Sequence, residues 1–115
     1  MTPDQYQQLA LETWYKPDEG IPWDEQMNQA ILQLNAEAGE LASLWAKHLF
    51  KPGHDMTRQE VLNELGDVWY YVRIIMALGD IDTDYLTESN HTKLQGGHGW
   101  NGSGDKVKAR LADKG

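Results

Sequence analysis

The sequence has no cysteine, one phenylalanine and four prolines among its 115 residues. Without cysteine the chain can form no disulfide, no zinc–thiolate site and no cysteine nucleophile, and we expect it in a reducing cytoplasm. Basic residues are also few, because ten Lys and Arg stand against 18 Asp and Glu, which gives a net charge of −8. This balance argues against binding to a nucleic-acid backbone, which needs a basic surface. A nucleotide substrate stays possible, since a divalent cation can bridge acidic side chains and phosphates.

Long hydrophobic runs are absent as well. No run of 18 apolar residues occurs, and the N-terminus lacks a basic region followed by an apolar one. We therefore expect neither a membrane span nor a signal peptide. The length suits one domain over residues 1–115, and 40% hydrophobic with 24% charged residues is an ordinary globular composition.

Apolar residues recur at helical spacing in four segments, and no segment alternates as a strand would. The predicted helices cover residues 4–15, 24–51, 58–79 and 83–94. Asp24 is the predicted N-cap of the second, and the third starts with a capping box at Thr57 and Glu60. Five glycines between 95 and 104 predict a loop and tail over 95–115 after a helical core at about 4–94. The predicted fold is all-α, an antiparallel four-helix bundle.

Each long predicted helix has an apolar stripe that we expect to face the core. On the helix over 24–51 the stripe consists of Met27, Ile31, Leu34, Ala38, Leu41, Trp45 and His48. On the helix over 58–79 it consists of Leu62, Leu65, Val68, Trp69, Val72, Ile75 and Met76. A short connection after Pro52 and Gly53 predicts that these two helices are antiparallel neighbours.

Two acidic pairs lie on these long helices, at the edges of the apolar stripes. Glu37 and Glu40 form one pair, and Glu64 and Asp67 form the other. The i, i+3 spacing places both carboxylates of a pair on one helix face. On neighbouring antiparallel helices the two pairs would bring four negative charges together, and like charges raise one another's pKa values unless a cation offsets them. Carboxylate oxygens favour Mg²⁺, Mn²⁺ or Ca²⁺, and Mg²⁺ favours sites that substrate phosphates complete.

A glycine lies inside each acidic pair, Gly39 in the first and Gly66 in the second. A glycine in a helix interior costs about 1 kcal/mol relative to alanine. Two such costs at matching places predict that another group approaches both helices closely. Acidic pairs at this spacing are also common on solvated helix faces, so the pattern alone leaves an inert, solvated role open.

Four ordered elements of the sequence together match one family. They are Glu37-x-x-Glu40, Glu64-x-x-Asp67 after 23 intervening residues, Asn90-x-x-Lys93-Leu94, and Gly102-Ser103-Gly104-Asp105. This series resembles the signature of the all-α nucleoside triphosphate pyrophosphohydrolases, in particular the MazG-like group. The resemblance covers about residues 6–105.

The resemblance implies hydrolysis of a nucleoside or deoxynucleoside triphosphate to the monophosphate and pyrophosphate, by water attack on the α-phosphorus. It implies Mg²⁺, or Mn²⁺, as the cofactor, and a homodimer or homotetramer as the assembly. The implied metal ligands and catalytic residues are Glu37, Glu40, Glu64 and Asp67. The implied substrate contacts are Asn90 and Lys93, with Lys47 and Asp105 as further candidates.

The sequence departs from the family at two places. Many members have a glutamate where this chain has Ala36, and many have an arginine shortly after the position of Leu94. A metal or water ligand and a phosphate contact are therefore in question. Two alternatives stay open at this point, a non-catalytic helical interaction module and an acidic cation-binding protein without a nucleotide. For stacking on a base we consider Trp23 and Trp100, in predicted loops, while Trp14, Trp45 and Trp69 fit a core or an interface.

Overall fold

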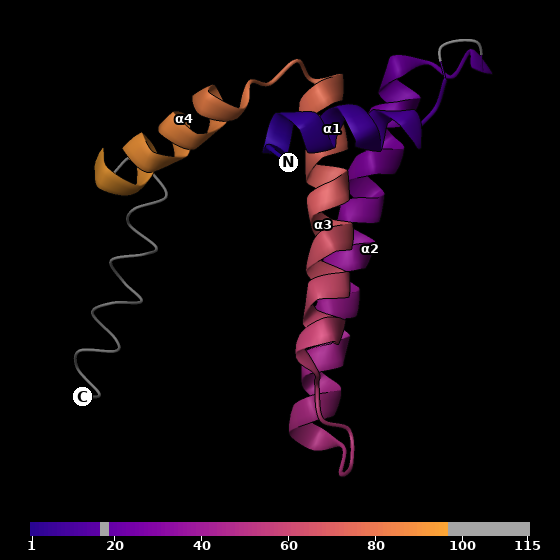
Figure 1. Cartoon of the computed structure of the whole chain (residues 1–115), viewed down its shortest axis with the longest axis vertical. Coiled ribbons are helices and arrows are strands. Elements are labelled where there is room, and N and C mark those ends of the chain that lie inside the picture. The colour runs from indigo at the N-terminus through magenta and orange to yellow at the C-terminus, as the bar shows by residue number, and fades with distance from the viewer. Residues whose placement is uncertain (17–18, 97–115) are drawn as a thin grey trace. The chain divides into compact units, whose positions relative to one another are not determined.

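The computed structural model describes residues 1–16 and 19–96, which contain four α-helices and no β-strand (Figure 1). The helices are α1 (Pro3–Glu12), α2 (Trp23–Phe50), α3 (Arg58–Leu78) and α4 (Thr83–Gly96). The chain divides into two compact units, Met1–Asp80 with α1 to α3 and Ile81–Gly115 with α4. The predicted all-α class is confirmed. None of the helices in the described ranges is long and apolar enough to cross a membrane.

Side-chain caps fix the starts of α1 and α3. The Thr2 hydroxyl accepts from the Gln5 backbone N–H at 3.1 Å, and the Gln5 side chain accepts from the Thr2 N–H at 2.7 Å. The predicted box at α3 is confirmed, because Thr57 Oγ1 accepts from the Glu60 N–H and Glu60 Oε1 accepts from the Thr57 N–H, both at 3.1 Å. Each box satisfies two backbone donors that the first helical turn leaves open.

The other helix ends differ from the prediction by one to three residues. Pro22 precedes the first residue of α2, so Asp24 is not the N-cap but lies in the first turn, where its charge suits the helix dipole. Helix α1 ends at Glu12, three residues early, and α4 continues to Gly96 through two residues that we predicted as loop. The predicted stop after α2 is confirmed, with Gly53 at a φ of 81° that favours glycine.

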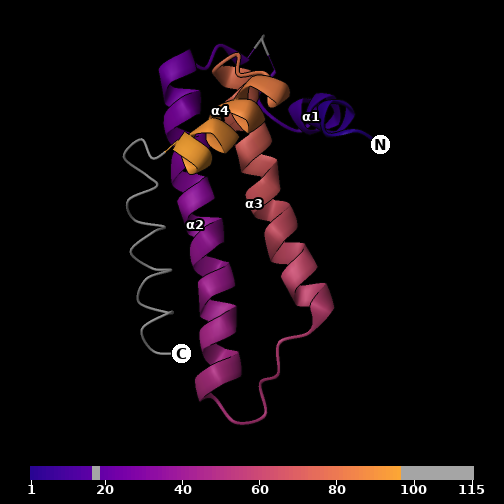
Figure 2. The same ribbon diagram turned by 90° about the vertical axis from the view of Figure 1, so that its left-hand side faces the viewer.

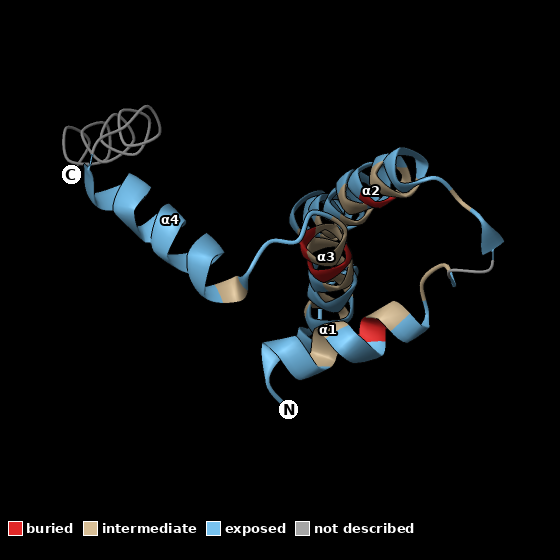
Figure 3. Ribbon diagram, turned by 90° about the horizontal axis from the view of Figure 1, so that it is seen from above, coloured by how far each residue is buried: buried red, intermediate tan, exposed pale blue. Residues whose placement is uncertain are grey.

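Helices α2 and α3 pack side by side as an antiparallel pair, and α1 lies across α3 (Figures 1 and 2). In the unit that they form, the fully buried residues gather where α1 meets this pair (Figure 3). Ala10, Ala30 and Ile74 make this core, one from each helix. The apolar side chains partly buried around it are Tyr6, Leu11, Trp14, Tyr70, Ile75 and Leu78.

Polar contacts hold the same end of the unit together. The Arg73 guanidinium donates to the Asp4 carboxylate at 2.9 Å and lies 5.4 Å from the centre of the Trp69 ring. The Arg73 side chain is 1% exposed and the Asp4 side chain is 75% exposed, so this pair links a buried position of α3 to the surface of α1. At the start of α2, the Trp23 indole N–H donates to the Leu78 carbonyl at 2.6 Å. Sequence reasoning missed Arg73, because an arginine is expected on the surface.

The stripes predicted to face the core only partly do so. Leu34 and Leu41 of α2 and Val68 and Val72 of α3 are partly buried, as predicted. By contrast the apolar side chains that remain exposed on the two helices include Ile31, Ala38, Trp45, Leu62, Leu65 and Trp69. The stripes are wide, and the α2–α3 contact covers one edge of each. A bundle of four helices remains a prediction, since the structure establishes the helices and the antiparallel α2–α3 pair.

Candidate functional site

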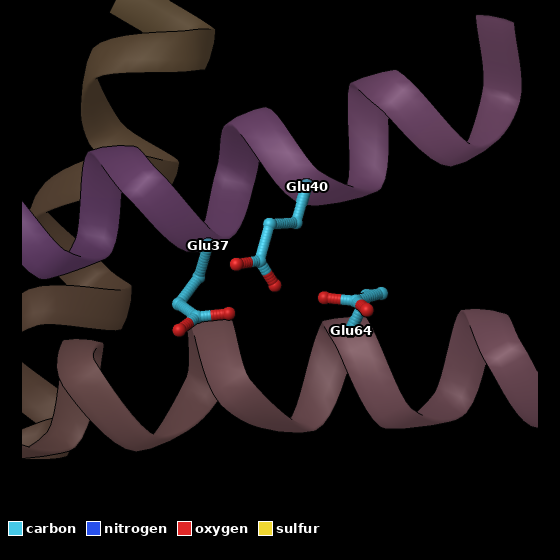
Figure 4. A group of neighbouring side chains, drawn as sticks. All are labelled: Glu37, Glu40 and Glu64. Carbon is cyan, nitrogen blue, oxygen red and sulfur yellow. The ribbon is translucent and has the colours of Figure 1, made fainter.

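Three carboxylates meet between α2 and α3. Glu37 and Glu40 come from α2 and Glu64 from α3, and one oxygen of each lies within 4.8 Å of those of the other two (Figure 4). We call these three residues the carboxylate cluster. The figure shows the Glu37 and Glu40 side chains projecting from α2 toward α3, with Glu64 reaching toward them. The antiparallel pairing thus brings together two predicted site residues of one helix and one of the other, 24 residues further along the chain.

The cluster is partly enclosed. Glu37 and Glu64 are partly buried, and Glu40 is exposed. Glu37 Oε2 and Glu64 Oε2 are shielded from solvent, and no hydrogen-bond donor in the described part of the chain reaches either atom. A shielded carboxylate oxygen without a donor is costly, because it has lost water and gained nothing. These two atoms therefore mark a place that suits a positively charged ligand.

The electrostatics of the cluster agree with its geometry. Burial and then the adjacent Glu40 carboxyl raise the pKa of Glu37. Burial and then the charge of Glu40 likewise raise the pKa of Glu64. No ion pair joins any of these carboxylates to a basic side chain within the described residues. A proton or a cation can offset this crowding, and the all-oxygen donor set matches what Mg²⁺, Mn²⁺ and Ca²⁺ bind.

Asp67, the fourth predicted carboxylate, is not part of the cluster. It lies on α3, three residues beyond Glu64, and its oxygens are not among those that meet within 4.8 Å. It is close enough for its charge to raise the pKa values of both Glu37 and Glu64. The structure therefore places Asp67 beside the cluster, at the end from which α3 continues toward the core.

Sequence reasoning missed two tyrosines in this region, Tyr71 near Glu37 of the cluster and Tyr6 near Asp67. Burial, followed by the Glu37 charge, raises the pKa of Tyr71 on α3. Burial, followed by Tyr70 and Asp67, raises the pKa of Tyr6 on α1. Both hydroxyls are protonated at neutral pH, as tyrosine ordinarily is, and can donate hydrogen bonds. The signal for Tyr71 was present in the sequence, since it lies four residues after Asp67 and so on the same helix face.

Lys47 lies apart from the carboxylate cluster. It lines a cavity of about 260 Å³ beside the α2–α3 turn, and none of the three clustered glutamates lines that cavity. Two further residues of the lining are His54 and Glu60. Lys47 follows Glu40 by seven residues, about two helical turns or roughly 10 Å. The structure therefore does not bring Lys47 to the three carboxylates.

The remaining predicted substrate contacts lie after residue 80. Asn90 and Lys93 are both on α4, in the second compact unit, at an i, i+3 spacing that places them on one face of the helix. Asp105 lies outside the described residues, as does Trp100. Trp23, the other predicted stacking residue, is the first residue of α2 rather than a loop residue, and its indole N–H is bonded to Leu78.

Comparison of the chain with protein-family models, curated proteins and solved structures found no match. The resemblance to MazG-like pyrophosphohydrolases accordingly rests on the four ordered motifs alone. The carboxylate cluster is an independent observation, because it depends on how α2 and α3 pack and not on any relative.

Proposed function

We propose that this protein is a Mg²⁺-dependent nucleoside triphosphate pyrophosphohydrolase of the MazG-like type. It would convert a nucleoside or deoxynucleoside triphosphate into the monophosphate and pyrophosphate. The observation that carries the proposal is the carboxylate cluster, with two shielded oxygens that have no donor in the described part of the chain. A solvated acidic face would leave such oxygens in water. The order of the motifs then favours a triphosphate over other ligands of a cation.

Glu37, Glu40 and Glu64 would hold the cation, with Asp67 as a fourth ligand or as a partner of its water shell. Mg²⁺ is favoured because it keeps some water and takes further oxygens from phosphates, and Mn²⁺ has a similar preference. Bound there, the cation would neutralise charge that builds on the phosphoryl oxygens and on the leaving pyrophosphate. Three or four carboxylates exceed the charge of one such ion, so the cluster has capacity for a second.

Glu37 is our candidate for the residue that orients and deprotonates the attacking water. Its carboxyl is partly buried and its pKa is raised, which makes it a better proton acceptor than an ordinary glutamate. In the proposed step the water oxygen bonds to the α-phosphorus while the bond to the bridging α–β oxygen breaks. The water proton passes to the Glu37 carboxylate, and the electron pair leaves with pyrophosphate.

Asn90 and Lys93 are proposed to contact the phosphates, Lys93 as a point charge and Asn90 through its amide. Asp105, outside the described residues, stays a weaker candidate for a substrate contact. Lys47 is a weaker part of the proposal, because its cavity is separate from the carboxylate cluster. Ala36 supplies no oxygen ligand where many family members have a glutamate, so the cluster must work with the carboxylates that are present.

We also propose that the protein works as a homodimer or homotetramer, joined through the outer faces of α2 and α3. The α3 side chains Leu62, Leu65 and Trp69 are 50%, 47% and 41% exposed and repeat at the three- and four-residue steps of a helix interface. On α2, Ile31 and Trp45 are each 49% exposed. Aromatic and leucine side chains in such rows are costly to leave in water.

The two glycines support the same assembly. A Cβ added at Gly39 or Gly66 would meet no atom of this chain within 4 Å. The close approach that we predicted from the sequence is therefore not made within one chain. A second copy that approaches α2 and α3 on their outer side would explain both glycines and the exposed apolar rows.

The test is pyrophosphate release from a panel of nucleoside and deoxynucleoside triphosphates, with Mg²⁺ and with EDTA. We expect Mg²⁺-dependent formation of monophosphate and pyrophosphate, lost in Glu64→Gln and kept in Glu25→Gln, which neutralises an exposed acid at the start of α2. Orthophosphate and a diphosphate as products would refute the proposed bond cleavage. Cation binding without turnover of any nucleotide would instead identify an acidic cation-binding protein.

A further inference from the structure

A second hollow lies where the chain that follows α1 meets α3. It is a cavity of about 410 Å³, within the range of small-molecule sites. We call it the aromatic cavity, because four of its six lining residues carry aromatic rings. The lining residues are Thr13, Trp14, Tyr15, Glu19, Tyr70 and Tyr71. They come from the chain after α1 and from α3, so the cavity lies within the first compact unit.

The rings are held against one another at fixed angles. Trp14 meets Tyr15 edge to face with ring centres 5.0 Å apart, and meets Tyr71 in the same way at 6.3 Å. Tyr70 and Tyr71 are also edge to face, at 5.0 Å. In each edge-to-face pair one ring is contacted on a face, while the faces of the other ring stay uncovered by that partner. Stacking of a base on such a face contributes about 1–3 kcal/mol to binding.

Tyr71 connects the aromatic cavity to the carboxylate cluster. It lines the cavity and also responds to the charge of Glu37. On α3 it follows Asp67 by four residues and Glu64 by seven, so the three lie on one face at intervals of one turn, about 5.4 Å. Tyr71 lies about two helical turns from Glu64, roughly 10 Å along α3. A nucleotide whose α-phosphate lies at the carboxylates would therefore have to span about that length to place its base in the cavity.

The hydrogen bonds of the lining decide what the cavity can recognise. The Thr13 hydroxyl donates its one proton to the Ala10 carbonyl at 2.8 Å, so in its 2.7 Å contact with Tyr70 the tyrosine is the donor. Both protons are thus used within the protein, and both oxygens keep lone pairs for a ligand.

The next two residues of the lining follow the same pattern. The Trp14 indole N–H donates to the Gln26 side chain at 2.9 Å, and the Tyr15 hydroxyl donates to the Gln29 side chain. Glu19, which is exposed at the edge of the cavity, adds a carboxylate that only accepts. Apart from Tyr71, the polar groups of the lining therefore offer acceptors to a ligand rather than protons.

We propose that the aromatic cavity binds the base of the substrate and selects a base whose edge donates hydrogen bonds, with guanine favoured. This inference rests on the proposed function. Guanine presents two adjacent N–H donors to a carboxylate such as that of Glu19, and adenine and cytosine each present an amino group. Uracil and thymine present one N–H between two carbonyl acceptors, and those acceptors would face the acceptors of the lining. Unmatched polar groups in a site discriminate strongly between ligands.

Nucleosides test this selection without phosphate or metal, so the result does not depend on hydrolysis. The full chain in EDTA is titrated with guanosine and with uridine while tryptophan fluorescence is recorded. We expect guanosine to quench at concentrations at least about tenfold lower than uridine, a difference of about 1.4 kcal/mol. Trp14→Phe should remove most of the guanosine signal, with far-ultraviolet circular dichroism as the check that this variant folds.

Glu19→Gln is the sharper variant, because the residue is exposed and the change keeps its size. It should reduce the guanosine preference at least fivefold, while Glu25→Gln leaves the preference unchanged. Equal quenching by the two nucleosides, or an unchanged preference in Glu19→Gln, would overturn the selection. Pyrophosphate release at equal kcat/KM from dGTP and dTTP would also overturn it and leave the proposed function standing. Selective guanosine binding without any pyrophosphate release would support the cavity and overturn the proposed function.

Discussion

The contact between α2 and α3 is built in two contrasting ways along its length. Near α1 the inward positions hold Ala30 and Ile74, both fully buried and packed against apolar neighbours. Two turns further along α2 the inward position holds Glu37, and α3 opposes it with Glu64. One stretch stabilises the pair, while the other places like charges where a core residue would be more stable. Charged residues at inward positions, where apolar residues would be more stable, indicate a site that serves ligand binding at a cost in stability.

The largest expected effect is on activity, in the charged stretch. Glu64→Gln keeps the size of the side chain and removes one cation ligand, so pyrophosphate release should fall by more than about 100-fold at saturating Mg²⁺, since changes even behind a metal ligand cost 10–100-fold. The same change relieves repulsion among three carboxylates, so the midpoint of thermal unfolding in EDTA should stay level or rise. Steady-state kinetics and circular dichroism melting give the two readouts.

A matched loss of activity and stability in Glu64→Gln would contradict this division of roles, because it would make Glu64 a structural residue. Glu25→Gln serves as the control for a one-unit change of charge on α2.

The apolar stretch should behave in the opposite way. Ile74→Ala removes a fully buried side chain at the centre of the core and should cost about 2–5 kcal/mol of unfolding free energy. Mg²⁺ binding at 10 °C, where the variant is still folded, should be close to that of the wild type, because the cluster does not include this residue. Urea denaturation followed by circular dichroism measures the first quantity, and isothermal titration calorimetry the second.

If Ile74→Ala instead weakened Mg²⁺ binding tenfold without a loss of stability, the apolar stretch would take part in cation binding, and the proposed division between stability and binding would be wrong. Ile75→Val, a smaller deletion at a partly buried neighbour, should lower stability by less and serves as the graded control.

Much of this contrast could be predicted from the sequence, and one part could not. Helical periodicity, the Thr57 capping box and the turn at Gly53 defined α2 and α3 to within about a residue. The i, i+3 spacing correctly placed Glu37 and Glu40 on one face. Periodicity does not say which edge of a wide apolar stripe another helix of the same chain covers, and for this reason Trp45 and Trp69 were assigned to a core or an interface without a choice between them.

The residues that sequence reasoning missed depend on tertiary contacts. Arg73 is buried with its guanidinium bonded to Asp4, which lies 69 residues earlier in the chain and on another helix. The aromatic cavity requires the segment after α1 to lie against Tyr70 and Tyr71, which no local pattern predicts. Conversely, the resemblance to a family linked Asn90 and Lys93 to the phosphates, a link that the packing of α1 to α3 neither requires nor tests.

A smaller effect is expected from the glycine on the outer side of the charged stretch. Gly66→Ala should stabilise the isolated helix by about 1 kcal/mol, since no atom of this chain lies within 4 Å of the added Cβ. If a second copy packs there, the same change should shift sedimentation velocity profiles toward monomer at micromolar concentration. An unchanged oligomer together with the gain in stability would remove Gly66 from the interface.

The smallest expected effect is in the pH dependence of stability. Two glutamates are compared, Glu37 with a raised pKa and Glu60 with a lowered one. Burial and the neighbouring Glu40 raise the pKa of Glu37 above the ordinary 4.5, so the folded chain binds more protons than the unfolded chain just above that pH. Stability from this group is therefore present at low pH and is lost as pH rises through its raised pKa. Hydrogen bonds from the Thr57 backbone and hydroxyl lower the pKa of Glu60, so its contribution is present above pH 4.5 and is lost as pH falls.

Thermal melting between pH 3 and pH 8 in EDTA separates the contribution of Glu37, which falls as pH rises, from that of Glu60, which falls as pH drops. Relative to the wild type, Glu37→Gln should lose the decline in stability above pH 4.5, and Glu60→Gln should lose the decline below it. The effects should be small, because both groups remain partly hydrated and water screens their charges.

Saturating Mg²⁺ should raise the wild-type melting temperature at pH 8 more than at pH 4.5, because the cation competes with protons for the same oxygens. Equal shifts at the two pH values would mean that the crowded carboxylates are not where the cation binds.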